Sequence, residues 1–175
     1  LNYYVTQMGS EPRIFLANWQ LSGKSKKSIR QAINQVKEQG LEIKEEASLL
    51  DLSVVSDAWL KTRACKVEID FLIRPLSMPY KQGVRYFYAY KNNCLVGFVL
   101  FDPIYHNGKI IAYIPNVSRS WNGFQQGLWY AMMAKAIQQF KDEGIEYVDL
   151  GLTPLSLSTE AEPQESKRFR KLLQL

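Results

Sequence analysis

The 175-residue sequence is 46% hydrophobic and 13% aromatic, which is enough apolar material for one globular domain with a sizeable core. Its longest apolar runs fall far short of the ~18 residues that a membrane-spanning helix needs, and no charged-then-apolar signal segment opens the chain. The net charge of +5 is modest and 17 acidic residues are interspersed, so total charge alone does not indicate nucleic-acid binding. Cys65 and Cys94 form no CxxC pattern, so we expect neither a zinc site nor a disulfide framework.

The first third of the chain predicts short strands alternating with helices. Residues 3–5 and 13–16 suit two short strands around a turn at 9–12. Residues 25–39 carry apolar side chains at helical spacing, and Gly40 follows as a stop. Residues 41–44 alternate like a short strand, and 48–63 return to a helical period.

The middle of the chain predicts a long connection followed by a β-hairpin. Residues 65–82 contain Pro75 and Pro79 and no clear period, which is typical of a connection or binding loop. Residues 84–90 and 94–101 are rich in β-forming side chains and are joined by Lys91, Asn92 and Asn93. Asn107-Gly108 predicts the next tight turn.

The segment 109–156 predicts a strand, a polar loop, a helix and a second strand. Apolar β-branched runs at 109–114 and 145–150 flank a loop at 116–126 and an amphipathic helix of about twenty residues that Gly144 ends. We therefore expect strands 110–114 and 145–150 to be parallel neighbours in a mixed sheet with flanking helices, splayed around the loop before the helix. Ligands of such sheets bind at the strand C-termini, so residues 116–126 and 151–156 form the candidate site.

Few residues at this predicted site carry acid or base chemistry. Asp149 ends the last strand, where its carboxylate has two possible roles: base or anchor for a substrate amine, or hydrogen-bond acceptor for the next loop. Tyr113 and Asp102 are weaker candidates of the same kind. The only histidine, His106, stands beside the Asn107-Gly108 turn, so a Ser-His-Asp triad is not expected.

Basic residues gather at the start of the predicted helix 25–39. Lys26, Lys27, Arg30 and Lys37 are on its polar faces, and most of them are in the half where the helix dipole disfavours cations. This placement indicates an anionic partner, and the alternative is an ordinary solvated basic face. A second basic helix is predicted at 163–175.

The element order is that of acyl-CoA enzymes of the GNAT type, in which a glycine-rich turn holds a pyrophosphate at a helix N-terminus. Here Arg119, Gly123 and Gly127 are spaced four apart, so the closely spaced glycines are missing and we do not expect coenzyme A as a cofactor. A phosphate-loop interpretation of Gly23-Lys24-Ser25 fails as well, because Asn18 stands where a glycine is needed.

Five segments between residues 20 and 156 are together fairly specific. They are Leu21-Ser22-Gly23-Lys24, Lys27-Ser28-Ile29-Arg30-Gln31-Ala32-Ile33-Asn34, Ser56-Asp57-Ala58-Trp59-Leu60, Asn122-Gly123 and Leu150-Gly151-Leu152-Thr153-Pro154-Leu155-Ser156. On these segments the chain resembles the cytosolic C-terminal domain of bacterial phosphatidylglycerol lysyltransferases. The resemblance implies a GNAT-like fold, usually in tandem, that transfers an amino acid from aminoacyl-tRNA to an anionic lipid head group without coenzyme A.

The sequence departs from that family at charged positions. In the strand 111–115 the family carries an Asp-Leu-Met-Arg motif, whereas Ala112 and Pro115 stand at its acidic and basic positions, and Gln126 replaces an acid after Asn-Gly. The strand therefore lacks a carboxylate that could hold an α-amino group and a guanidinium that could hold an oxyanion. Both would have made charge-assisted hydrogen bonds, which are stronger than neutral ones. Two hypotheses remain: a transferase that moves an aminoacyl or other acyl group to a lipid head group or amine, or a non-catalytic module that binds tRNA or an anionic membrane surface.

These considerations give one set of expectations. We expect a single GNAT-like domain over residues 1–175, interpreted as a fragment of a longer chain that carries a second such domain. Its expected place is the cytoplasm, with attachment to the inner face of the membrane in the full-length protein as one arrangement. The catalytic candidates are Asp149 and Tyr113, and the substrate-binding candidates are Lys26, Lys27, Arg30, Asn116, Arg119, Asn122, Gln126, Gly151, Thr153 and Ser156.

Overall fold

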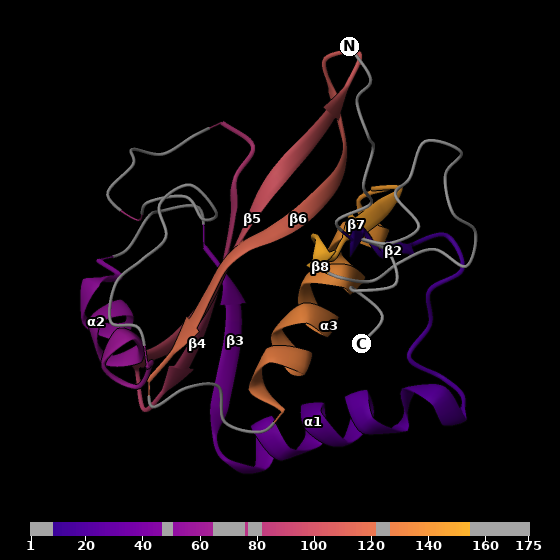
Figure 1. The fold of residues 1–175 in the computed structure, drawn as a ribbon. Helices are drawn as coiled ribbons and strands as arrows, with labels where there is room; N and C mark the ends of the chain where they lie inside the picture. The colour runs from indigo at the N-terminus through magenta and orange to yellow at the C-terminus, as the bar shows by residue number, and fades with distance from the viewer. Residues whose placement is uncertain (1–8, 47–50, 65–75, 77–81, 122–126, 155–175) are drawn as a thin grey trace, which may run out of the picture.

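A mixed sheet forms the centre of the protein. The computed structural model describes residues 9–46, 51–64, 76, 82–121 and 127–154. Within them a six-stranded sheet has the order β2-β7-β6-β5-β4-β3 (Figure 1). Its strands are β2 (Arg13–Phe15), β3 (Leu41–Glu45), β4 (Arg85–Lys91), β5 (Cys94–His106), β6 (Lys109–Ser120) and β7 (Tyr147–Asp149). Two further strands, β1 (Gly9–Ser10) and β8 (Thr153–Pro154), pair as a small separate sheet.

Helices cover both faces of the six-stranded sheet. A short 3₁₀ helix, η1 (Lys24–Lys26), leads into α1 (Lys27–Glu38), which packs with α3 (Leu128–Asp142) against one face. Helix α2 (Ser53–Lys61) lies on the other face (Figure 1). Strand alternation divides the core accordingly. Phe87, Val99, Phe101, Tyr113, Val148 and Phe140 belong to the α1/α3 side, and Val55, Tyr88, Phe98, Leu100 and Val117 belong to the α2 side.

The predicted parallel pair is confirmed. Strand β6 runs parallel to β7, with Ala112 opposite Tyr147 and Tyr113 opposite Val148. The pairing between them covers these two positions, after which β6 continues away from β7 (Figure 1). Strand β7 ends at Asp149, so the predicted splaying of the pair stays a prediction. On its outer edge β7 pairs antiparallel with β2, which the sequence placed as a strand but not in this position.

The predicted hairpin is also confirmed. Strands β4 and β5 are antiparallel, and the turn residues Asn92 and Asn93 have positive φ values of 49° and 63°. Asn107 adopts the same conformation, with φ 49°, at the next turn. Asparagine tolerates this left-handed region better than most residues, which explains its place at both turns.

The prediction that residues 116–126 form a loop is wrong for its first half. Strand β6 extends to Ser120, because β5 is long enough to pair with it as far as Gly97. The register shifts between Leu100, opposite Val117, and Phe101, opposite Pro115, so Asn116 is the extra residue of a β-bulge. Polar residues there indicated a loop, but a bulged strand accommodates them as well.

The helices differ in length from the predictions. Helix α3 has 15 residues rather than about twenty, and it begins after Gly127, whose φ is 99°. The described part of the predicted helix 48–63 is helical from Ser53, whose backbone N–H donates to Asp51 Oδ1 at 3.0 Å. The strand predicted at 3–5, the start of helix 48–63, most of the connection 65–82 and the helix 163–175 lie outside the described residues. None of the described helices is both long and apolar enough to cross a membrane.

Candidate functional site

A strip of polar side chains lies on the α2 face of the sheet. Leu100 and Val117 are opposite each other in the core under α2, so Asp102, two residues after Leu100, points to the same face. Asn116 Nδ2 donates a hydrogen bond to Asp102 Oδ2 at 2.6 Å, and both side chains are half-buried. Asp149 follows Val148, whose side chain faces α3, and therefore points to the α2 face as well.

A buried arginine ends this strip. Arg119 is 1% exposed, and its side chain follows that of Val117 on the same face. One guanidinium nitrogen donates to Ser56 Oγ on α2, and the guanidinium carbon is 4.9 Å from the centroid of the Trp59 ring. A planar guanidinium can stack on an aromatic face while its edge donates hydrogen bonds. Arg119 therefore fastens α2 to the end of β6. We call Ser56, Asp102, Asn116, Arg119 and Asp149 the polar strip.

The side chain of Asp149 is engaged through both oxygens. It is 3% exposed; Oδ2 accepts from Arg13 Nε at 3.1 Å, and Oδ1 accepts from the Gly151 backbone N–H at 2.9 Å. The hydrogen bond to Asp149 raises the pKa of Arg13. Of the two roles considered for Asp149, the geometry provides the hydrogen bond to the following loop. Each carboxylate oxygen retains a further lone pair, but the side chain is buried, so a role as base would require a substrate to reach it beneath the surface.

Tyr113 points away from the polar strip. Its ring is 3% exposed and stacks on Phe140 with centroids 4.3 Å apart, and the Arg85 guanidinium lies 5.6 Å from the ring. Burial raises the pKa of Tyr113, and the hydrogen bond with Arg85 opposes that rise. Asp149 and Tyr113, the two catalytic candidates, therefore project to opposite faces of the sheet. The structure does not bring their functional groups together.

An ion-pair network surrounds Arg85 on the α3 side. Arg85 donates to both oxygens of Glu45 and to both oxygens of Glu143, with distances of 2.6 and 2.9 Å to Glu143, and Gln139 also donates to Glu45. Its guanidinium lies 5.1 Å from the Phe140 ring centroid. The network joins β3, β4 and the end of α3, so its role is structural.

The other predicted binding residues lie apart from one another. Gly151 follows β7 with φ 81°, and a Cβ built on it would lie 3.8 Å from Ile114 Cδ1, which places this turn beside β6. Thr153 is exposed and pairs with Ser10 in the small sheet. Asn122, Gln126 and Ser156 lie outside the described residues.

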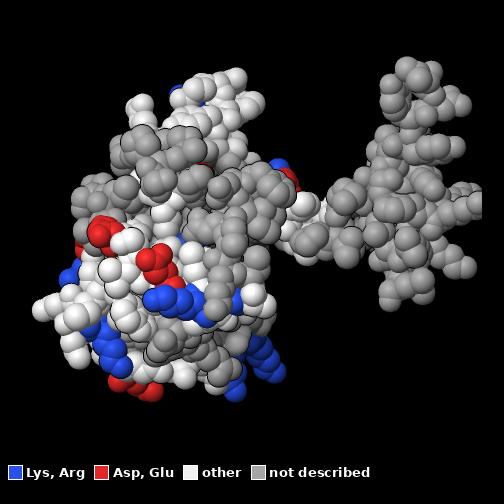
Figure 2. Space-filling view, turned by 60° about the vertical axis from the view of Figure 1, so that its left-hand side comes forward, with Lys and Arg blue, Asp and Glu red and all other residues white. Residues whose placement is uncertain are grey.

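The basic residues at the start of α1 differ in their contacts: Arg30 binds the preceding loop, and the lysines face solvent to different degrees. Arg30 donates to the carbonyl oxygens of Leu21 at 2.5 Å and Gly23 at 2.9 Å, so it closes the loop before the helix. Lys27 is exposed and Lys26 is half-buried, and the first turn contains neither an acidic residue nor a side-chain cap. The predicted basic surface therefore rests on the lysines. On the face around α2 that Figure 2 shows, basic and acidic side chains of the described residues are interspersed.

The start of α3 borders an open groove, and residues 122–126 before this helix lie outside the described residues. This groove is lined by α1 and by Gly127 and Tyr130, and its polar side chains are carboxamides, two hydroxyls and the carboxylate of Glu38, without a lysine or arginine among the described lining. A cofactor pyrophosphate needs cations or converging backbone N–H groups. Among the described residues, no three His, Cys, Asp or Glu side chains are grouped so that they could hold a metal ion.

Sequence reasoning missed part of the polar strip. Ser56 and Trp59 belong to the family-like segment 56–60, and their spacing of three places them on one face of a helix. That spacing was a usable signal for a shared contact. The pairing of Asp102 with Asn116 and the partners of Arg119 depend on the register between β5 and β6, which no local pattern reveals.

A mixed six-stranded sheet with one parallel pair, joined through a long helix and flanked by further helices, is the architecture of a GNAT-like acyltransferase fold. The family model for the C-terminal domain of phosphatidylglycerol lysyltransferase matches residues 1–175, and the chain belongs to this family. No curated protein matches the sequence significantly.

Solved structures agree on the fold. L-PGS from Bacillus licheniformis matches with a TM-score of 0.67 and 20% identity, over 95% of this chain and 51% of that one. The C-terminal domain of a protein assigned as a lysylphosphatidylglycerol synthetase from Agrobacterium fabrum matches with a TM-score of 0.62 and 18% identity, over 94% and 50%. A conserved protein of unknown function from Bacteroides thetaiotaomicron gives 0.58 and 14%, over 97% and 55%. The chain thus spans about half the length of the structures it matches.

Proposed function

We propose that this chain is a transferase unit that moves an aminoacyl group from aminoacyl-tRNA to the head group of an anionic phospholipid, at the polar strip. The observation that supports this most is the match to the phosphatidylglycerol lysyltransferase family over the whole chain. The polar strip supplies charged groups beside the parallel pair of β6 and β7, and ligands of such sheets bind where parallel strands end.

The acid that would bind the substrate amine comes from a neighbouring strand, because the Asp-Leu-Met-Arg motif is missing from β6. Ala112 and Pro115 cannot bind an amine or an oxyanion, but Asp102 stands opposite Ile114 on the next strand. Its carboxylate, oriented by Asn116, would hold the amino group of the aminoacyl donor by a charge-assisted hydrogen bond. Arg119 would act as a positioning residue that holds α2 over the site. Asp149 would orient the turn at Gly151.

We further propose that coenzyme A is not a cofactor. The groove at the start of α3 has no cation among its described lining residues, and Glu38 would repel a phosphate there. Calorimetric titration with acetyl-CoA should give no binding at micromolar concentrations. Micromolar affinity would contradict the proposal and would indicate an acetyl-CoA-dependent enzyme of this fold.

A non-catalytic binding module is the second candidate. The observation in its favour is that both catalytic candidates already have structural partners, Asp149 with Arg13 and Gly151, and Tyr113 with Phe140. Such a module would bind tRNA or an anionic membrane surface through Lys26 and Lys27. Because the chain spans about half of the matched structures, we also propose that it is one unit of a longer protein that carries a second GNAT-like domain and lies at the cytoplasmic face of a membrane.

Transfer of a radiolabelled amino acid from lysyl-tRNA to phosphatidylglycerol vesicles tests the two candidates in the full-length protein. Asp102→Asn removes the charge but keeps the shape, and it should lower transfer about tenfold to a hundredfold, the range for a lost hydrogen bond to a charged group. Asp142→Asn, at the exposed end of α3, is the matched control and should leave the rate unchanged. No transfer by the wild type, together with retained tRNA binding, would favour the binding module.

A further inference from the structure

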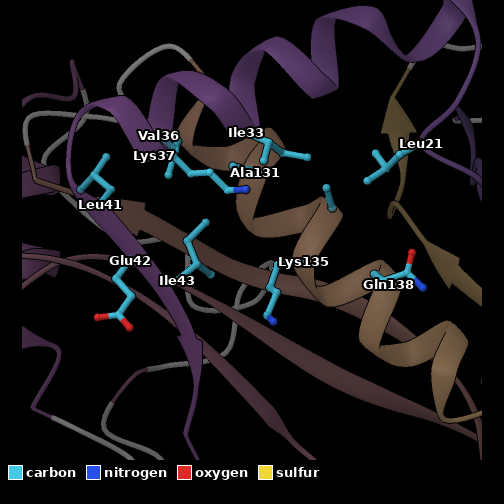
Figure 3. A pocket seen from close by; sticks show the side chains of 11 residues that line it. Leu21, Ile33, Val36, Lys37, Leu41, Glu42, Ile43, Ala131, Lys135 and Gln138 are labelled. Carbon is cyan, nitrogen blue, oxygen red and sulfur yellow. The ribbon is translucent and has the colours of Figure 1, made fainter.

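A second open groove lies on the α1/α3 side of the sheet, opposite the polar strip. Helices α1 and α3 and strand β3 border it, and its volume is about 490 Å³ (Figure 3). This volume is in the range of pockets that hold small organic ligands, which are mostly apolar with a few polar groups. Of the residues named so far for a site or a basic surface, only Lys37 lines it, and no residue of the polar strip does.

The floor of the groove is aliphatic. Ile33 and Val36 come from α1, Leu41 and Ile43 from β3, and Ala131 from α3. Ile33 and Ile43 are only partly buried although they pack against the main core, so solvent reaches core side chains at this place. Because the side chain of Ala131 is small, α3 does not project far into the groove at this position. A flexible hydrocarbon chain fits such a surface better than an aromatic ring, since none of the described lining residues is aromatic and could stack on a ring.

The rim of the groove carries unpaired positive charge. Lys37 on α1 and Lys135 on α3 are both exposed, and within the described part of the chain neither ammonium group has a hydrogen-bond or ion-pair partner (Figure 3). Glu42, the acid at the rim, is paired with Lys44 at 2.9 Å. The remaining charge at the groove is therefore that of two lysines, and it complements an anionic group.

We propose that this groove binds a free long-chain fatty acid, with its alkyl chain on the aliphatic floor and its carboxylate between Lys37 and Lys135. A fatty acid has one alkyl chain and one carboxylate, and the groove offers one aliphatic floor and one cationic rim. The site lies on the face of the sheet opposite Asp102, so its ligand is distinct from the acceptor lipid of the proposed transfer reaction. Because the groove joins α1 to α3, bound fatty acid would also hold the two helices together.

A chain-length series on the wild-type protein tests the aliphatic part. Octanoate, decanoate and dodecanoate are titrated below their micellar concentrations, with methyl NMR signals of Ile33, Ile43 and Ala131 as the local readout. Each pair of carbons should tighten binding by about fifteenfold, or about fourfold per methylene, until the floor is covered. No binding of dodecanoate, an affinity that does not change with chain length, or shifts confined to other residues would each overturn the proposal.

The head-group part is tested with the lysines. The double variant Lys37→Met and Lys135→Met should bind dodecanoate about threefold to tenfold more weakly and should bind dodecanol as the wild type does. Lys109→Met, at an exposed hairpin turn, is the matched control and should change neither affinity. Equal affinity of the wild type for dodecanoate and dodecanol would overturn the assignment of the carboxylate. Lysine-dependent binding to anionic vesicles without binding of monomeric dodecanoate would show instead that the groove docks on a membrane.

Discussion

Individual side chains fix the sheet to its helices through charged contacts. Arg85 binds Glu45 and Glu143, and the hydrogen bond from Arg85 lowers the pKa of Glu143 below its ordinary value of 4.5. A carboxylate with a lowered pKa stabilises the folded state above its unfolded pKa, and this contribution is lost as the pH falls through the folded value. The stability from Glu143 is therefore present at neutral pH and is lost as the pH falls below 4.5 and through the lowered folded pKa.

This linkage gives a prediction for Glu143→Gln. The variant should lower the free energy of unfolding at pH 7 by less than about 1 kcal/mol, because the Glu143 side chain is 41% exposed and solvent screens the pair. The difference from the wild type should shrink as the pH falls through the lowered pKa of Glu143, because a protonated Glu143 is as neutral as the glutamine. Urea unfolding at several pH values measures it. A difference that is constant with pH would mean that the ion pair is not responsible.

Arg119 gives a second prediction at the residue scale. Replacement of a buried charge by an apolar side chain of similar length is often nearly neutral, whereas truncation leaves a cavity. Arg119→Met should therefore unfold within about 1 kcal/mol of the wild type. Arg119→Ala should lose about 2–5 kcal/mol, as truncations of large buried side chains do. Equal losses in urea unfolding would mean that the contacts of the guanidinium with Ser56 and Trp59, rather than packing, provide the stability.

The sequence predicted single residues best where the backbone alone decides their role. Asn92, Asn93 and Asn107 were placed in tight turns, because the left-handed conformation selects for asparagine, and all three have positive φ. The partners of Asp149 and Tyr113 were not predictable in the same way. Arg13 is 136 positions from Asp149 in the chain, and Phe140 reaches Tyr113 only after α3 has folded back on the sheet.

At the scale of elements, helix periods and turn signals were reliable and strand ends were not. The period of residues 25–39 and Gly40 located α1, since side-chain spacing and a stop signal are local properties. The end of β6 was misplaced because it depends on β5, whose length supports pairing up to Ser120. Asn116 and Arg119 consequently project from a strand at fixed positions rather than from a loop.

The start of α3 gives a prediction about elements. Gly127 has φ 99°, and a Cβ there would lie 3.2 Å from both Cα and Cβ of Ala32 on α1. Gly144, at the other end of α3, has φ 81° with open space around the position of a Cβ. Gly144→Ala should cost about 1 kcal/mol from backbone strain alone, and Gly127→Ala should cost more because α1 must also move. Chemical unfolding of both variants measures the difference, and equal costs would contradict the close packing of α1 on α3.

For the whole molecule, the sequence predicted the architecture of the sheet and helices. It did not predict which face of the sheet carries polar side chains and which carries an apolar groove. The order strand, helix, strand predicted the parallel pair, because parallel strands need a crossover connection. Which face carries charges is set by register, and here the α2 face carries the polar strip while the α1/α3 face carries the aliphatic groove. The open end of the groove was not predictable, since Ile33 and Ile43 read as ordinary core residues in the sequence.

The last prediction concerns the basic surface at the start of α1. Arg30 is bound to the loop at 21–23, so the surface is tested with Lys24, Lys26 and Lys27 alone, which stand at the end of the helix where the dipole disfavours cations. If tRNA or an anionic membrane binds there, affinity should fall steeply with salt, because phosphate neutralisation releases counterions and because screening shortens the reach of a membrane potential. Reversal of the three charges to glutamate should abolish binding to tRNA or anionic vesicles and shift the free energy of unfolding by less than about 0.5 kcal/mol per residue.

A second triple variant is the matched control. It changes the net charge by the same amount but at lysines far from the start of α1. Lys61, Lys91 and Lys109 are exposed at the end of α2 and at two hairpin turns, and their reversal to glutamate leaves the start of α1 intact. If only total charge matters, both triple variants should weaken binding equally over a salt series, because the screened attraction between two charged bodies then depends on net charge alone. If the α1 lysines form the contact, only their reversal should reduce both the affinity and the slope of its dependence on salt, since the slope counts the neutralised phosphates.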